Sequence, residues 1–217
     1  MKKIALISGV LFLSASLSYG YTLTGRKWFS SGDAVFYLNS ANGPSCCLSS
    51  SALNSAILSG ISAWGTVSHG GSTTASGARA DGVNAISWGK LGGTTLGVTN
   101  YVTTDTSQSQ VCNGALLYRF EEVDVRFNNA YSWQTSSGCS GGFDLSGVSV
   151  HEFGHVIGLG HSSVQSATMY ASVAACDFSK SSLESDDRNG YSAIYSCGGG
   201  GGGGGGNGGG GGKPPKN

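Results

Sequence analysis

The chain has 217 residues, which is enough for one domain with a substantial core and too few for two large ones. Basic and acidic residues number 12 each, but four lysines lie at the two ends of the chain, which leaves 8 basic against 12 acidic residues between them. The body is therefore mildly acidic, and this balance argues against nucleic acid, a phosphate-rich ligand or an anionic membrane surface as the partner.

The first 20 residues have the composition of a signal peptide. A short basic start is followed by an apolar run over residues 4–17, and small residues at 18–20 offer a cleavage position. The run is shorter than the roughly 20 apolar residues that a bilayer requires, so a retained anchor helix is the weaker alternative. We expect a secreted, extracellular protein without a membrane span, with the periplasm as the alternative location; the leader resembles a bacterial one.

Residues 21–197 are expected to form a single domain. Apolar residues three and four apart predict an amphipathic helix, and Val123, Val125 and Phe127 alternate with polar residues as in a strand. Asp144 is a suitable N-cap for a second helix. Early strands with helices around them indicate an α+β domain. The expected elements are a strand at 35–38, a helix at 50–64, a loop at 66–77, strands at 83–88, 96–102 and 116–127, a helix opening at 144 and a helix at 183–195.

The C-terminal segment 198–217 is a Gly-rich tail, with 14 glycines in residues 198–212. It cannot bury enough apolar surface to fold, so we expect a disordered tail, with a tether to a surface or polymer as the alternative.

Six cysteines lie outside the leader, an even number that suits an oxidising compartment and predicts up to three disulfides. Six cysteines can form three disulfides in about 15 different pairings, and all of these pairings stay open. The adjacent pair is expected to join two different bridges, and the absence of C-x-x-C spacing argues against a cysteine zinc site. The cysteines are Cys46, Cys47, Cys112, Cys139, Cys176 and Cys197.

The segment from His151 to His161 carries the chemistry. On a helix, His151 and His155 lie one turn apart on one face, so both imidazoles can reach one ion. Gly158 allows the chain to leave the helix, which can bring His161 back as a third nitrogen ligand. Three nitrogens leave one position of a tetrahedral zinc ion open, as a catalytic site requires. Glu152 is then placed to take the proton of a zinc-activated water that attacks a carbonyl.

H-E-x-x-H-x-x-G-x-x-H, followed by Met169 in Ala-Thr-Met-Tyr, resembles the metzincin zinc metallopeptidases, in which such a methionine forms a turn beneath the metal. Ser162 after the third histidine is similar to the matrixin (matrix-metalloproteinase-like) branch, as are Phe143-Asp144-Leu145 and segment 183–195. The resemblance implies a metzincin or zincin-like catalytic domain: a twisted, mainly parallel sheet above a cleft, an active-site helix and a C-terminal helix.

The resemblance also implies how substrate binds. Leu96, Gly97 and Val98 would form an edge strand that pairs with an extended protein or peptide substrate. Tyr170 and Ala171 would wall the main specificity pocket, although matrixins usually have proline at the second position.

In the last helix, the resemblance implies that one of Asp186 and Asp187 braces the methionine turn and that the other pairs with the mature N-terminal ammonium. No propeptide with a zinc-binding cysteine fits after residue 20. We therefore expect Tyr21 to be the first mature residue and the source of that ammonium. Only His69 remains outside the motif, so the family's histidine-rich structural zinc site cannot be built and one Zn²⁺ per chain is expected. Ca²⁺ is possible, but the sequence does not place it.

Together these features predict a secreted, monomeric zinc metalloendopeptidase that hydrolyses internal peptide bonds. Two alternatives stay open. One is a catalytically silent zinc-binding adhesive module tethered by the glycine tail, which the presence of Glu152 disfavours. The other is a zinc hydrolase that acts on a non-peptide amide.

Overall fold

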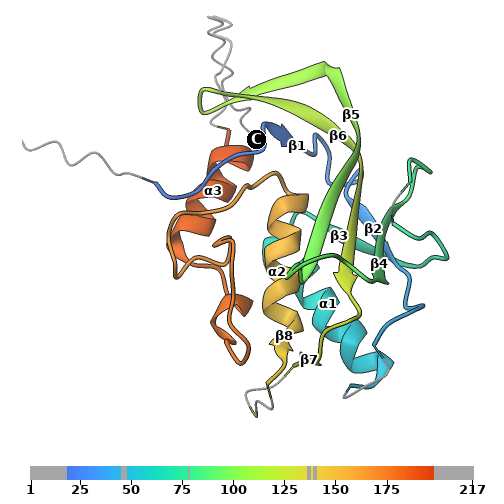
Figure 1. Ribbon diagram of the computed structural model, residues 1–217. Helices are drawn as coiled ribbons and strands as arrows, with labels where there is room; N and C mark the ends of the chain where they lie inside the picture. The colour runs from blue at the N-terminus through green and yellow to red at the C-terminus, as the bar shows by residue number, and fades with distance from the viewer. Residues whose placement is uncertain (1–18, 45–47, 78, 136–137, 139–140, 198–217) are drawn as a thin grey trace, which may run out of the picture.

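The computed structural model describes residues 19–44, 48–77, 79–135, 138 and 141–197. A six-stranded sheet, with helices packed against it, organises the domain (Figure 1). Neighbours in the order β1-β6-β4-β2-β3 run parallel, whereas β5 pairs with β6 in the antiparallel sense. This confirms the α+β class with a mainly parallel sheet. The strands are β1 (Arg26–Lys27), β2 (Val35–Leu38), β3 (Ser68–Ser72), β4 (Asn84–Gly89), β5 (Gly97–Cys112) and β6 (Ala115–Asn128).

Strand β5 is much longer than the expected strand at 96–102, which was wrong in its end point. It continues to Cys112 and returns as β6 through a two-residue turn in which Asn113 and Gly114 have φ of 48° and 84°. Asn-Gly suits this turn because both residues tolerate positive φ. The dipeptide is the signal that the sequence prediction did not use.

The loop expected at 66–77 was also wrong in part, since β3 lies within it. This strand pairs in parallel with β2, and Gly70 lies where a β-carbon would be 2.6 Å from the ring of Tyr37. A strand of serine, histidine and glycine has no apolar alternation, so its pairing depends on this close approach rather than on a sequence pattern.

Three α-helices have clear boundary residues. Ser49 caps α1 (Ser50–Trp64) at its start, and Gly65 ends it with φ of 67°. Asp144 accepts hydrogen bonds from the backbone N–H groups of Ser146 and Gly147, as predicted for the N-cap of the second helix. The remaining elements are α2 (Leu145–Val156), α3 (Ser185–Tyr195), the short 3-10 helix η1 (Ser179–Ser181), and a separate parallel pair formed by β7 (Trp133–Gln134) and β8 (Phe143–Asp144).

Helix α2 packs against both α1 and the sheet. Trp64 of α1 donates its indole N–H to Val150 O at 2.9 Å. A β-carbon at Gly60 would lie 2.2 Å from the hydroxyl of Ser149, so the two helices touch through backbone. On the sheet side, the rings of Phe36 and Phe153 meet edge to face at 5.5 Å. The helix that carries the histidines is therefore rigidly placed.

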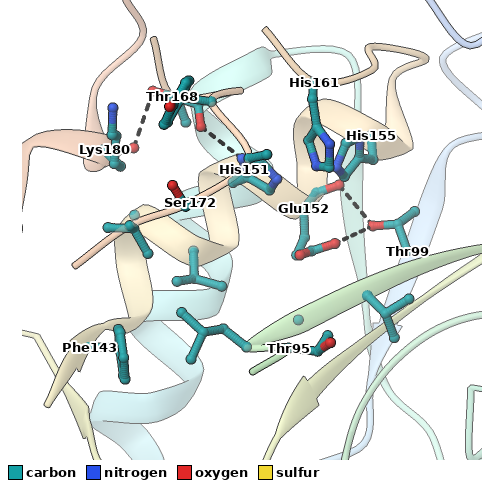
Figure 2. Close-up of a pocket in the computed structure, with 18 of the residues that line it drawn as sticks. Thr95, Thr99, Phe143, His151, Glu152, His155, His161, Thr168, Ser172 and Lys180 are labelled. Atoms are coloured by element: carbon teal, nitrogen blue, oxygen red, sulfur yellow. Dashed lines mark hydrogen bonds between the residues drawn. The ribbon is translucent and has the colours of Figure 1, made fainter. Parts of the chain in front are cut away.

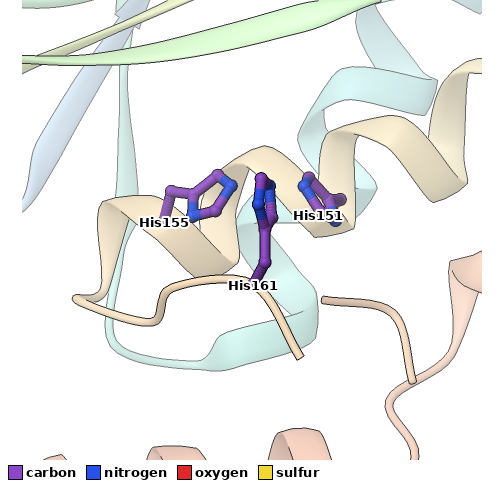
Figure 3. A group of neighbouring side chains, drawn as sticks. All are labelled: His151, His155 and His161. Atoms are coloured by element: carbon purple, nitrogen blue, oxygen red, sulfur yellow. The ribbon is translucent and has the colours of Figure 1, made fainter. Parts of the chain in front are cut away.

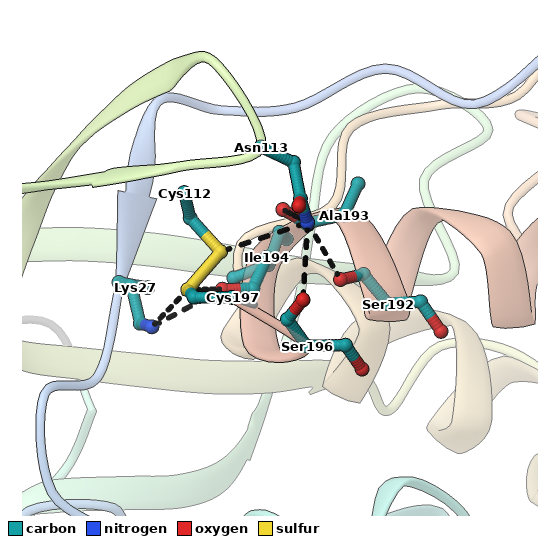
Figure 4. The surroundings of a disulfide bond; sticks show 8 residues. All are labelled: Lys27, Cys112, Asn113, Ser192, Ala193, Ile194, Ser196 and Cys197. Carbon is teal, nitrogen blue, oxygen red and sulfur yellow. Dashed lines mark hydrogen bonds between the residues drawn. A yellow bond between two sulfur atoms is a disulfide. The ribbon is translucent and has the colours of Figure 1, made fainter. Parts of the chain in front are cut away.

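A disulfide joins Cys112, at the tip of the β5–β6 hairpin, to Cys197 just after α3 (Figure 4). The side-chain N–H groups of Asn113 lie 3.3 Å from three carbonyl oxygens at the end of α3. Cys176 is disulfide-bonded as well. Cys46, Cys47 and Cys139 lie outside the described residues. The prediction that the adjacent cysteines join two different bridges therefore stays a prediction.

No helix in the described part of the chain has the length and apolar character needed to cross a bilayer.

Candidate metal centre and active site

Three histidines converge on one point beside α2 (Figure 3). His151 and His155 project from consecutive turns of the helix, and Gly158, with φ of 105°, reverses the chain so that His161 faces them. A β-carbon at Gly158 would lie 2.1 Å from Arg26 O, so only glycine fits this turn. One potential ligand atom from each histidine lies within 4.8 Å of the others.

Backbone carbonyls orient two of the imidazoles. The Nδ1 atoms of His151 and His155 lie 2.7 Å from Thr168 O and 2.8 Å from Leu159 O, respectively. Burial lowers the pKa of His151 to about 3 and that of His155 to about 4. Both rings are therefore neutral at physiological pH, with Nδ1–H donated to the carbonyl and the Nε2 lone pair available.

Glu152 is the buried acid beside these rings (Figure 2). Burial raises its pKa to about 7, and a hydrogen bond from the Thr99 hydroxyl to Oε2 at 2.8 Å acts in the opposite direction. The same hydroxyl lies 3.1 Å from Glu152 O. A β-carbon at Gly97 would be 2.7 Å from Oε1, so β5 presents bare backbone to the carboxylate. This carboxyl group is held in place and can exchange a proton near neutral pH.

Met169 is fully buried and lies against Gly154 of α2, the residue directly before His155. Asp187 holds the turn that carries it: its two oxygens accept hydrogen bonds from Thr168 N at 2.8 Å and Met169 N at 3.0 Å. The structure therefore places Asp187 at the methionine turn.

Asp186 instead faces the N-terminal segment of the domain, residues 20–24. Its oxygens accept hydrogen bonds from Gly20 N at 2.8 Å and from the Ser162 hydroxyl at 2.6 Å. In the unprocessed chain the nitrogen that faces Asp186 is therefore that of Gly20, and Tyr21 as the first mature residue stays a prediction. The ring of Tyr21 lies against Gly190 of α3, which fixes the register of the strand.

A cleft of about 620 Å³ opens over the three histidines and Glu152 (Figure 2). One rim is the start of β5, which among the described strands pairs only with β6 and is therefore an edge. Sequence-predicted residues at the rim and wall all line the cleft: Leu96, Gly97, Val98, Tyr170 and Ala171.

Several supporting residues were not predicted from the sequence. The Thr99 hydroxyl donates a hydrogen bond to the Glu152 carboxylate, and the Tyr101 hydroxyl donates one to His155 O at 3.2 Å. Their alternation with Gly97 on one face of β5 is a signal that could have identified them. Lys180 also lines the cleft, and its ammonium donates hydrogen bonds to Gln165 O and Ala167 O. No local pattern marks it, because its partners lie in a distant loop.

The donor set fits a zinc ion. Three imidazoles converge, and two of them have the second nitrogen bonded to a carbonyl, as zinc-binding histidines usually do. Within the described residues this is the one group of three or more potential ligands. His69 lies on exposed β3, apart from it.

Comparison with known proteins supports the matrixin family. The model of the family described as Matrixin matches residues 100–196, which include the three histidines and Glu152. Human matrix metalloproteinase-27 is 42% identical over 72 residues, 33% of this chain and 14% of that protein. Human neutrophil collagenase is 36% identical over 96 residues, 42% of this chain and 20% of that protein. Metalloendoproteinase 5-MMP of Arabidopsis thaliana is 46% identical over 52 residues, 24% of this chain and 14% of that protein.

The chain thus spans a fifth or less of the length of these relatives. They are animal and plant proteins, so the bacterial character of the leader stays a prediction.

Proposed function

We propose that this protein is a secreted zinc-dependent endopeptidase of the matrixin type. The observation that carries the proposal is the convergence of three histidines beside a buried glutamate, inside a cleft whose rim is an unpaired strand edge. The similarity to metalloproteinases over residues 100–196 supports the same class.

His151, His155 and His161 would hold the metal through their ring nitrogens. Zinc, when bound in such a site, supplies a Lewis acid that activates water and polarises a carbonyl. Glu152 would accept the proton of the attacking water and later deliver it to the leaving amine, which its near-neutral pKa suits. Thr99 fixes the carboxylate during both transfers.

The edge of β5 would bind substrate by adding the extended peptide as a further strand. Gly97 allows this edge to lie directly against the Glu152 carboxylate, because a β-carbon there would be 2.7 Å from Oε1. The wall at Tyr170 and Ala171 would receive one substrate side chain, in a cleft also lined by Tyr131, Phe143 and Val148. This lining favours an apolar side chain.

The remaining parts of the proposal concern export. Residues 1–20 act as a signal peptide, residues 21–197 as the peptidase domain and residues 198–217 as a disordered tail. Three disulfide-bonded cysteines in the described chain, Cys112, Cys197 and Cys176, fit an oxidising compartment. We propose a monomer with one Zn²⁺.

The test measures zinc content and cleavage of unfolded casein for the wild type and for Glu152→Ala, with Glu121→Ala, an exposed glutamate on the same chain, as the control. We expect one zinc per chain in all three proteins and cleavage by the wild type and the control only. The loss in Glu152→Ala should be at least about 100-fold, the usual contribution of a general base. Zinc without casein cleavage in the wild type would instead favour the silent binding module or a non-peptide substrate.

A further inference from the structure

The N-terminal strand of the domain, residues 20–24, lies antiparallel to the loop that carries His161 (Figure 1). Backbone hydrogen bonds of 2.8–3.0 Å join the two segments. They are so close that a β-carbon at Gly160 would lie 2.3 Å from the Thr22 hydroxyl oxygen. The strand and the loop therefore form one ribbon.

His161 differs from the other two histidines in how it is held. The rings of His151 and His155 are oriented by backbone carbonyls at Nδ1. The ring of His161 is exposed and has no hydrogen bond to any described residue. Its position therefore depends on how firmly the backbone of its loop is fixed.

Besides the backbone bonds from Gly160 and Ser163 to residues 20–24, two hydrogen bonds act at and directly after the ligand residue. On one side, Ser162 N donates to Met169 O at 2.8 Å. On the other side, the Thr22 hydroxyl donates to His161 O at 2.8 Å, directly at the ligand residue. Thr22 is the only member of the N-terminal strand that bonds His161 itself among the described contacts.

We propose that Thr22 is a positioning residue for the third metal ligand. Its hydroxyl holds the His161 carbonyl so that the imidazole faces His151 and His155, and loss of this bond weakens metal retention. The inference rests on the proposed function, because it concerns a zinc ion held by these three histidines. It assigns a role at the metal site to Thr22, which lies 139 positions before His161 in the sequence.

The test compares Thr22→Val, which keeps the shape but removes the hydroxyl, with Thr24→Val as a matched control. Thr24 lies in the same strand and donates to Gly158 O at 2.9 Å, away from the ligand residue. Zinc dissociation constants are measured by competition with a chromophoric chelator, and thermal unfolding of each metal-free protein is recorded alongside. Thr22→Ser serves as the rescue variant.

We expect Thr22→Val to bind zinc about 10-fold to 100-fold more weakly, the usual effect of losing an outer-shell partner. Thr24→Val should stay within about 3-fold of the wild type, and Thr22→Ser should match it. Should Thr22→Val not fold, Thr22→Ala is measured in the same way.

Equal zinc affinity of Thr22→Val and the wild type would overturn the inference, as would an equal loss in Thr24→Val. A wild type that takes up no zinc would overturn the proposed function as well, so the two failures can be told apart.

Discussion

The sulfur of Met169 lies beside Gly154 of α2, in the space that a side chain on this helix would fill. A β-carbon at Gly154 would be 2.1 Å from that sulfur and 3.0 Å from the ring of Trp64. The turn that carries Met169 and the helix that carries the histidines are therefore in close contact at Gly154.

Gly154→Ala should destabilise the protein. Alanine improves helix propensity by roughly 1 kcal/mol, but crowding in a packed core costs about 1–3 kcal/mol, so we expect a net loss of about 1–2 kcal/mol. Thermal or urea unfolding checks this. Gly92→Ala is the control, because no atom lies within 4 Å of a β-carbon there. A Gly154→Ala protein as stable as the control would contradict the packing argument.

Asp187→Asn should be strongly destabilising. The buried carboxylate accepts hydrogen bonds from three backbone N–H groups, those of Thr168, Met169 and Glu184. An amide nitrogen cannot accept from them, so we expect a loss of about 3 kcal/mol in the free energy of unfolding. Glu121→Gln, at an exposed carboxylate, should change it by less than about 0.5 kcal/mol. Similar effects of the two substitutions would refute the assigned role.

Asp124→Asn should stabilise the protein at neutral pH and not at pH 4. Burial, with the nearby charges of Glu122 and Asp81, raises the pKa of Asp124 to about 6, and its Oδ2 has no partner among the described residues. Because the folded pKa lies above the unfolded value, ionisation between about pH 4 and 7 costs the native state stability, up to about 3 kcal/mol. Asparagine does not ionise, so the Asp124→Asn variant does not lose this stability as the pH rises.

Urea unfolding of Asp124→Asn and the wild type at pH 4 and pH 8 measures the difference at each pH, so that other titrating groups cancel. A difference that does not change with pH would show that Asp124 is ionised normally.

Removal of the Cys112–Cys197 disulfide should lower stability without altering the cleft. The bond closes a loop of 85 residues, and constraining the unfolded chain in this way contributes about 4 kcal/mol. Thermal unfolding of the double Cys→Ala variant should show this loss. Asn113→Gly keeps the positive φ but removes the contacts with the end of α3, and should cost only about 1 kcal/mol. Loss of zinc binding in either variant would mean that the hairpin tip affects the site.

A protein that begins at Gly20 should be more stable than one that begins at Tyr21. In the first, the terminal ammonium coincides with the nitrogen that Asp186 accepts from; in the second, this hydrogen bond is lost. Asp186→Asn should remove most of the difference. Thermal unfolding of the four proteins checks this, and N-terminal sequencing of the exported protein shows which start occurs. Equal stability of the two starts would contradict a role for this contact.

The sequence predicted the parts of the fold that local chemistry determines. The capping residue Asp144, the amphipathic period of α1 and the buried run of β6 were each visible as patterns, and so was the histidine motif. The far half of β5 was missed because its residues are polar and exposed on both faces, so its pairing depends on the Asn113-Gly114 turn and the disulfide.

The supporting residues of the site were out of reach for a different reason. Thr99 donates a hydrogen bond to Glu152, 53 residues later in the sequence, and Thr22 donates one to His161, 139 residues later. A threonine in an extended segment shows no sequence pattern that indicates such a distant partner. The contact of Gly20 N with Asp186 was out of reach for the same reason, since the register of segment 20–24 is set by tertiary contacts such as that of Tyr21 with Gly190.

Strand β5 begins at the cleft and ends at a covalent bond to the C-terminal end of α3. At its near end it rests on Glu152 through Gly97 and Thr99. A strand fixed at both ends cannot swing outward as a unit, so the rim is already ordered in the free protein. In the proposed function a peptide that adds to this edge would be the only partner to be ordered, because the entropy that a mobile rim would lose on each encounter has been lost once, during folding.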